Sequence, residues 1–115
     1  MMKKGCVVPP ECCVIIEMEK GASLGYRKAV LLNEIQALGS LKKAAKVTKI
    51  DQRHARELIR EINAVFSQPL VDFKGNYRNS DSVKLTEKGE KTVHSYWRQF
   101  ERVWLDIMQE RSRHY

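Results

Sequence analysis

The sequence has no apolar run that approaches the roughly 20 residues needed to cross a membrane. Its first residues include lysines, as in a signal peptide, but Pro9, Pro10 and Glu11 interrupt the apolar part that would follow. These features argue against a membrane span and against secretion. We therefore expect a cytoplasmic protein with no membrane partner.

Cysteine is scarce and is confined to one end of the chain. The three cysteines are Cys6, Cys12 and Cys13. An odd number argues against a disulfide framework, and the adjacent pair lacks the spacing of a zinc site. We expect no metal site, and the simpler interpretation is that one cysteine of the pair faces the core from a strand.

The patterns that mark enzymes are also missing. The sequence shows no Ser/His/Asp set, no Gly-rich phosphate loop and no paired acid motif. The histidines at 54, 94 and 114 are far apart and share no metal-ligand spacing. The sequence therefore predicts a protein that is not an enzyme and needs no cofactor.

What the chain does have is a globular composition and a basic surplus. It has 115 residues, which suits one domain with a modest core, and 43% of them are hydrophobic. The formal net charge is +7. A surplus of this size favours a polyanionic partner such as nucleic acid.

Residues 12–21 are β-branched and end in Gly21, which predicts a first strand after a flexible arm at 1–11. Residues 25–39 then show helical spacing that ends at Gly39. The apolar residues on the inner face of this helix are Leu31, Leu32, Ile35 and Leu38.

The stretch "GSLKKAAKVTKIDQRHARELIREIN" predicts a helix-turn-helix. Ser40 is the expected N-cap of a short helix that ends near Val47, and Asp51 is the expected N-cap of the next. Small alanines let the two helices cross closely, and Ile50 fills the gap in the turn. The apolar stripe of the second of these helices is Ala55, Leu58, Ile59, Ile62 and Phe66.

A hairpin and a long helix follow. "PLVDF" and "SVKL" predict two strands joined by the turn-rich "KGNYRNSD", and Thr86 caps a helix of about 86–113. Gly89, one turn into this helix, predicts close approach of another backbone. The fold class is therefore mainly α (α+β), a winged helix-turn-helix over 12–115 with an N-terminal strand and a two-stranded wing.

In such a fold the second helix of the pair enters the major groove of DNA. Arg pairs with guanine and Gln with adenine there, while other cations meet phosphate. The candidate DNA-binding residues are Ser40, Lys42, Lys43, Lys49, Gln52, Arg53, His54, Arg56, Arg60, Lys74, Asn76, Tyr77 and Arg78.

The segment "LLNEIQALGSLKKAAKVTKIDQRHARELIREIN", followed by a hairpin and "VKLTEKGEKTV", resembles the N-terminal DNA-binding domain of ModE-type, molybdate-responsive transcriptional regulators. It is more distantly similar to LysR-type regulators. The resemblance covers about residues 20–105. It implies a homodimer on a palindromic operator in double-stranded DNA, with the helix from Gln52 as reader and "KGNYRNSD" as wing.

Two features depart from that family. Lys49 stands where such motifs usually have glycine in the turn, so we expect the turn to adopt another geometry. ModE proteins usually carry C-terminal molybdate-binding domains, and this sequence ends soon after the long helix. We therefore expect a ModE-like regulator that lacks the molybdate-binding domain.

The long helix carries a seam of apolar residues at heptad spacing, typical of a short coiled coil. Near Val93 we expect the seam to pack on its own domain. Farther out, too little chain remains to cover two tryptophans, which favours a partner subunit. The candidate dimer-interface residues are Val93, Tyr96, Trp97, Phe100, Val103, Trp104, Ile107 and Met108.

The predicted function is that of a dimeric, sequence-specific DNA-binding regulator. The alternatives are a winged-helix protein–protein interaction module without direct DNA binding, and an RNA-binding domain. A protein-binding module is expected to expose apolar residues on the reader helix, and a single-strand RNA reader is expected to expose aromatics there. The outward Gln52, Arg53 and Arg56 favour DNA.

Overall fold

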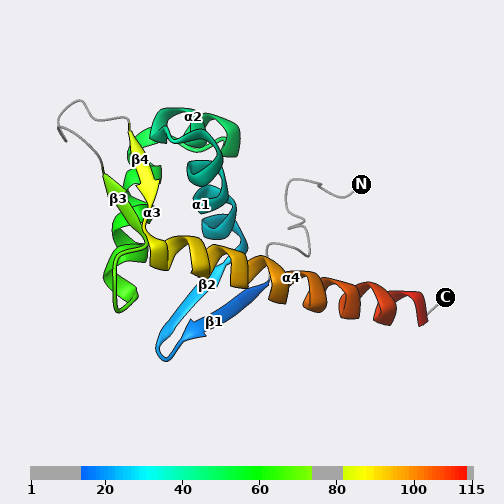
Figure 1. Cartoon of the computed structure of the whole chain (residues 1–115). Helices are drawn as coiled ribbons and strands as arrows, with labels where there is room; N and C mark the ends of the chain where they lie inside the picture. The colour runs from blue at the N-terminus through cyan, green and yellow to red at the C-terminus, as the bar shows by residue number, and fades with distance from the viewer. Residues whose placement is uncertain (1–13, 74–81, 114–115) are drawn as a thin grey trace.

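A hairpin, three helices, a second hairpin and a last helix follow one another along the chain, and the last helix extends beyond the rest (Figure 1). The computed structural model describes residues 14–73 and 82–113. Its elements are β1 (Ile15–Glu19), β2 (Ala22–Gly25), α1 (Tyr26–Leu38), α2 (Leu41–Thr48), α3 (Gln52–Val65), β3 (Val71–Phe73), β4 (Val83–Leu85) and α4 (Glu87–Arg113). This order confirms the predicted α+β winged helix. The expected arm at 1–11 and the cysteines lie outside the described residues.

The predicted first strand is present as β1, but it pairs with a strand that sequence analysis missed. β1 and β2 are antiparallel, with Ile16 opposite Leu24, and the chain turns at Gly21, whose φ is 81°. A positive φ is accessible to glycine without steric cost. β2 has only four residues and no β-branched run, so it carries no strand signal of its own.

Side-chain and backbone caps fix where the three central helices start and stop. Gly39 ends α1 with a φ of 67°, and its N–H donates to the carbonyl of Ile35. The Ser40 hydroxyl accepts from the Lys43 N–H at the start of α2, and the Asp51 carboxylate accepts from the Arg53 N–H at the start of α3. Each of these predicted caps is confirmed.

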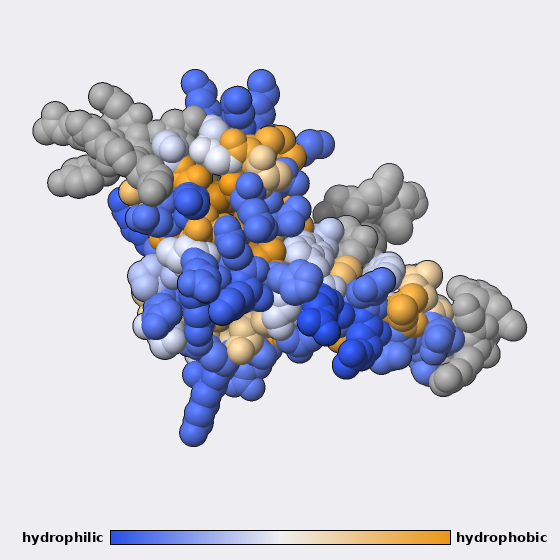
Figure 2. Space-filling model, in the orientation of Figure 1, coloured by the Kyte–Doolittle hydropathy of each residue, from blue (hydrophilic) through white to orange (hydrophobic). Residues whose placement is uncertain are grey.

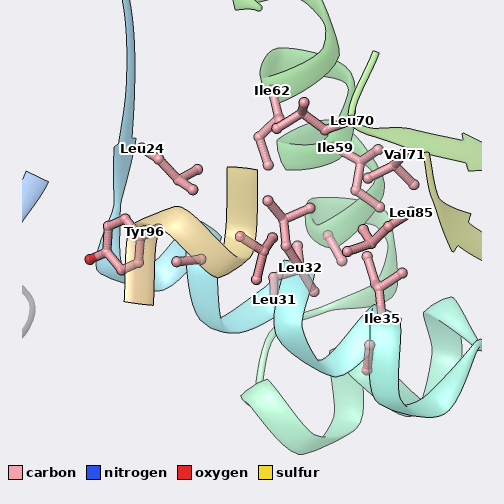
Figure 3. Packing of buried hydrophobic residues seen from close by; sticks show 14 of the residues in the cluster. Leu24, Leu31, Leu32, Ile35, Ile59, Ile62, Leu70, Val71, Leu85 and Tyr96 are labelled. Atoms are coloured by element: carbon pink, nitrogen blue, oxygen red, sulfur yellow. The ribbon is translucent and has the colours of Figure 1, made fainter. Parts of the chain in front are cut away.

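The core lies where α1, α2 and α3 meet the two hairpins and the first half of α4. Figure 3 shows Leu31 and Leu32 of α1 facing Ile59 and Ile62 of α3. The prediction for Leu38 is wrong: this side chain is 40% exposed, because α1 ends there and the chain turns away through Gly39. Leu58 is half-buried at the edge of the same core.

The wing hairpin is joined tightly to the first turn of α4. Val71 pairs with Leu85 and Phe73 with Val83 in an antiparallel register. The Thr86 hydroxyl donates to the Pro69 carbonyl at 2.7 Å and accepts from the Gly89 N–H at 3.0 Å. A Cβ at Gly89 would collide with the Leu70 carbonyl, which confirms the close backbone approach predicted for this glycine.

α4 has two different halves. Its first half crosses the body of the domain, and its second half projects away from it toward the C-terminus (Figure 1). No helix in residues 14–73 and 82–113 is both long enough and apolar enough to cross a membrane. Within the same ranges, no three His, Cys, Asp or Glu side chains gather into a metal site.

Candidate nucleic-acid interface

The turn between α2 and α3 keeps the geometry usual for a helix-turn-helix, although it holds lysine. Lys49 has φ 60° and ψ 41°, so the expectation of another turn geometry is wrong. The Ile50 N–H donates to the Ala45 carbonyl at 3.0 Å, and the Lys49 N–H donates to the Lys46 carbonyl at 3.1 Å. These two bonds form a Schellman motif, and Ile50 packs against the core. Together they offset the roughly 1–2 kcal/mol cost of left-handed backbone at Lys49.

α3 separates an apolar face from a charged one. Ala55, Ile59 and Ile62 are buried against the core. The opposite face is a shallow, open surface that we call the reader face; its members are Gln52, Arg53, Arg56, Glu57 and Arg60. The structure thus brings together four of the predicted DNA-binding residues, with one carboxylate among them.

Arg56 connects the reader face to the wing. Its guanidinium lies over the ring of Phe73 in β3, 5.8 Å from the ring centroid. A cation at this distance is attracted by the ring, and the contact limits the rotamers of a long side chain. Arg56 is half-buried, whereas Arg53 and Arg60 are exposed. Arg56 is therefore held in place before any partner binds.

Asn63, near the end of α3, fixes the wing to the reader helix. Its side-chain oxygen accepts from the Leu70 N–H at 2.9 Å and from the Val71 N–H at 3.1 Å. Its amide donates to the Val71 carbonyl at 3.1 Å. Sequence analysis missed this residue. The available signal was an asparagine, a weak helix former, inside a strongly periodic helix.

The start of α2 supplies a second cationic group beside the wing. Lys42 and Lys43 are exposed there, next to the Ser40 cap. Ser40 also forms an isolated antiparallel bridge with Ser82, just before β4. The first turn of α2 and the base of the wing are therefore neighbours.

Two further predicted DNA-binding residues, His54 and Lys49, line another groove. Ile50, Leu58 and the start of α1 line the same groove. His54 is exposed as expected, but it points to the flank of α3 because it lies about 100° around the helix from Arg53. The wing-tip residues Lys74, Asn76, Tyr77 and Arg78 lie outside the described residues.

The predicted dimer seam divides between core and surface. Val93 and Tyr96 are buried in the chain's own core, and the Tyr96 hydroxyl donates to the Val14 carbonyl at 3.0 Å. Trp97 and Phe100 pack against Tyr26 of α1, with ring centroids 5.8 and 5.5 Å apart. Trp97 is therefore partly covered by its own domain, and its place in a dimer interface stays a prediction.

Beyond Phe100 the seam is open to solvent. Val103, Leu105 and Met108 are 37%, 54% and 41% exposed, and Trp104 and Ile107 are partly exposed beside them. Leu105 was not predicted, because it falls outside the heptad spacing. Figure 2 shows hydrophobic residues among hydrophilic ones on this projecting arm. We call Val103, Trp104, Leu105, Ile107 and Met108 the distal seam.

A curated relative agrees with the resemblance found in the sequence. The chain is 26% identical over 86 residues to the transcriptional regulator ModE of Haemophilus influenzae. The match covers 75% of this chain but 34% of ModE, so the chain corresponds to about a third of that protein's length. The resemblance to ModE-type regulators is confirmed at this level. No known protein-family profile matches the chain.

Solved structures with the same fold are also transcription regulators. MepR of Staphylococcus aureus superposes with a TM-score of 0.60 at 14% identity, covering 76% of this chain and 65% of MepR. DarR of Vibrio fischeri, a LysR-type regulator crystallised with DNA, gives a TM-score of 0.62 at 17% identity, covering 77% of this chain and 29% of DarR. At these identities the likeness shows the winged-helix fold. Each of these three proteins is a regulator of transcription, in agreement with the expectation that the chain is not an enzyme.

Proposed function

We propose that the chain is a sequence-specific module that binds double-stranded DNA in a transcriptional regulator, and that it acts as a homodimer. The observation that carries this proposal is the reader face. Three arginines and a glutamine share one side of α3, and the opposite side is buried in the core. This function requires the cytoplasmic location expected from the sequence.

In the proposed complex α3 enters the major groove. Gln52, Arg53 and Arg56 come from its first two turns, which is where a recognition helix meets base edges. Arg can bond guanine and Gln can bond adenine through paired hydrogen bonds. Arg60, Lys42 and Lys43, together with the wing-tip Lys74 and Arg78, are proposed to meet phosphates and set the orientation.

The distal seam supports the homodimer. Five apolar residues within two turns of the projecting half of α4 leave a surface that water solvates poorly. A second copy of the same helix would cover it symmetrically. Two reader helices held in this way would bind the two halves of a palindromic operator about 34 Å apart.

The alternative, a winged-helix module that binds protein and not DNA, fits the reader face less well. The centre of a protein interface is depleted in charge, whereas this face is made of charged and amide side chains. The experiment that tests the proposal is selection from a pool of random duplexes, followed by titration of the selected duplex and of a mixed-sequence duplex.

The proposal expects enrichment of a sequence with two-fold symmetry, and binding of the selected duplex at least about a thousandfold tighter than of the mixed one. Equal affinity for the selected and the mixed duplex would show that the protein binds DNA by charge attraction alone, without sequence specificity. Absence of binding to any duplex at low salt would overturn the proposal in favour of the protein-binding alternative.

A further inference from the structure

Glu57 is the one carboxylate on the reader face of α3. It is exposed, and it lies one helical turn from Arg53 on one side and from Arg60 on the other. Within residues 14–73 and 82–113, no ion pair engages the Glu57 side chain. A carboxylate on this face therefore meets whatever ligand the arginines meet.

Glu61, on the next turn of the same helix, behaves differently. Its carboxylate lies 3.5 Å from the Nζ of Lys28 in α1, and it is not part of the reader face. Two exposed glutamates four residues apart thus have different surroundings. Glu61 contacts a cation of its own chain, whereas Glu57 is directed to the outside.

A carboxylate that faces DNA is repelled by the phosphates, and only a hydrogen bond that it accepts from a base can offset this repulsion. The donors that the major groove presents are the N4 amino group of cytosine and the N6 amino group of adenine. On adenine this donor lies beside the N7 acceptor, which repels a carboxylate as well. Cytosine has no acceptor of its own on that edge. A carboxylate on a recognition helix therefore favours cytosine over the other bases.

We infer that Glu57 is a specificity-determining residue, which accepts a hydrogen bond from the N4 amino group of a cytosine in each half-site. This inference rests on the proposed DNA-binding function. In the bound state the arginines raise the affinity for DNA of every sequence. Glu57 lowers the affinity for each site that lacks a hydrogen-bond donor at its position. Specificity of this kind comes from an unfavourable term for the wrong partner.

The experiment compares the unmutated protein with Glu57→Gln and Glu57→Ala, using Glu61→Gln as the matched control. Each protein is used to select from the same random duplex pool. Each is then titrated against the selected duplex, its single-base variants and a mixed-sequence duplex of equal length. Circular dichroism verifies that the exposed substitutions leave the fold intact.

We expect the unmutated protein to require cytosine at one position of each half-site, by about tenfold over the other bases. Glu57→Ala removes that preference, and Glu57→Gln removes it or shifts it to adenine, because an amide bonds adenine. Both raise affinity for the mixed duplex severalfold. Glu61→Gln keeps the cytosine preference.

Two results would overturn the inference. One is the same base preference at every position in the Glu57 variants and the unmutated protein. The other is an equal gain in affinity for selected and mixed duplexes, which would give Glu57 a role in net charge alone. Failure of the proposed function is distinct, because the unmutated protein itself would then enrich no sequence.

Discussion

α3 and the distal half of α4 are both amphipathic helices, but they leave opposite surfaces exposed. On α3 the apolar stripe is buried and the charged face is free. On distal α4 the apolar residues are free, because the domain ends before the helix does. An exposed cationic face suits a polyanion, whereas an exposed apolar seam suits another protein surface. In the proposed function α3 contacts DNA, and the distal half of α4 holds the two subunits together.

We expect the largest effect from introducing charged residues into the distal seam, which tests its proposed role in assembly. Trp104→Glu combined with Ile107→Glu should give a folded monomer that binds the selected duplex at least about a hundredfold more weakly, because one half-site is then engaged at a time. Sedimentation and titration measure the two effects.

Gln99→Glu combined with Gln109→Glu is the matched control for this double variant. It adds the same charge at exposed positions of α4 outside the distal seam. It should leave assembly unchanged. Sedimentation of the unmutated protein as a monomer at tens of micromolar would contradict the assembly role of the seam.

The link between the reader helix and the wing can be cut at Asn63. Asn63→Ala leaves the Leu70 and Val71 N–H groups without their acceptor. We expect the free energy of unfolding to fall by about 2–6 kcal/mol, since each of the two unpaired part-buried donors costs about 1–3 kcal/mol. Urea denaturation measures this change. Asn33→Ala, on the exposed face of α1, should change it by less than about 0.5 kcal/mol.

The reader face is tested by removing its arginines. Arg53→Ala and Arg56→Ala should each weaken binding of the selected duplex by about 1–3 kcal/mol, and weaken binding of a mixed duplex less. Equal losses on both duplexes would show that these arginines touch phosphate only. Arg98→Ala, an exposed arginine on α4, is the control and should change neither affinity by more than a small, uniform amount.

The smallest expected effect concerns Glu19, which links the segment after α3 to the first turn of α4. Hydrogen bonds from the Lys88 ammonium, then from the Ser67 N–H, hold the pKa of Glu19 below its ordinary value. Lys88 Nζ lies 2.8 Å from Glu19 Oε1, and Ser67 follows the end of α3. A lowered folded-state pKa stabilises the fold above about pH 4.5, and this contribution is lost as pH falls through the folded value.

Denaturation midpoints measured from pH 6 down to pH 3 should therefore fall less steeply in Glu19→Gln than in the unmutated protein. Identical slopes for the two proteins would remove Glu19 as a link between α3 and α4.

The sequence by itself determined the features that depend on neighbouring residues. Gly39, Ser40 and Asp51 set helix ends through bonds within a few residues, and the stripe of α3 follows from helical period. The two wing strands follow from short apolar runs on either side of turn residues. Such signals are local, because helix caps and apolar periodicity both depend on residues within one or two helical turns of one another.

Only the tertiary structure decided which side chains share a surface. In the structure β2 pairs with β1, and His54 lies on the flank of α3. Lys49 adopts a left-handed backbone conformation in the turn. The tertiary structure also divided one heptad seam into a buried half and an exposed half, because that depends on where the rest of the domain ends. Contacts between residues distant in sequence, such as Asn63 with Val71 or Tyr96 with Val14, depend on packing of the whole chain, and no local pattern encodes them.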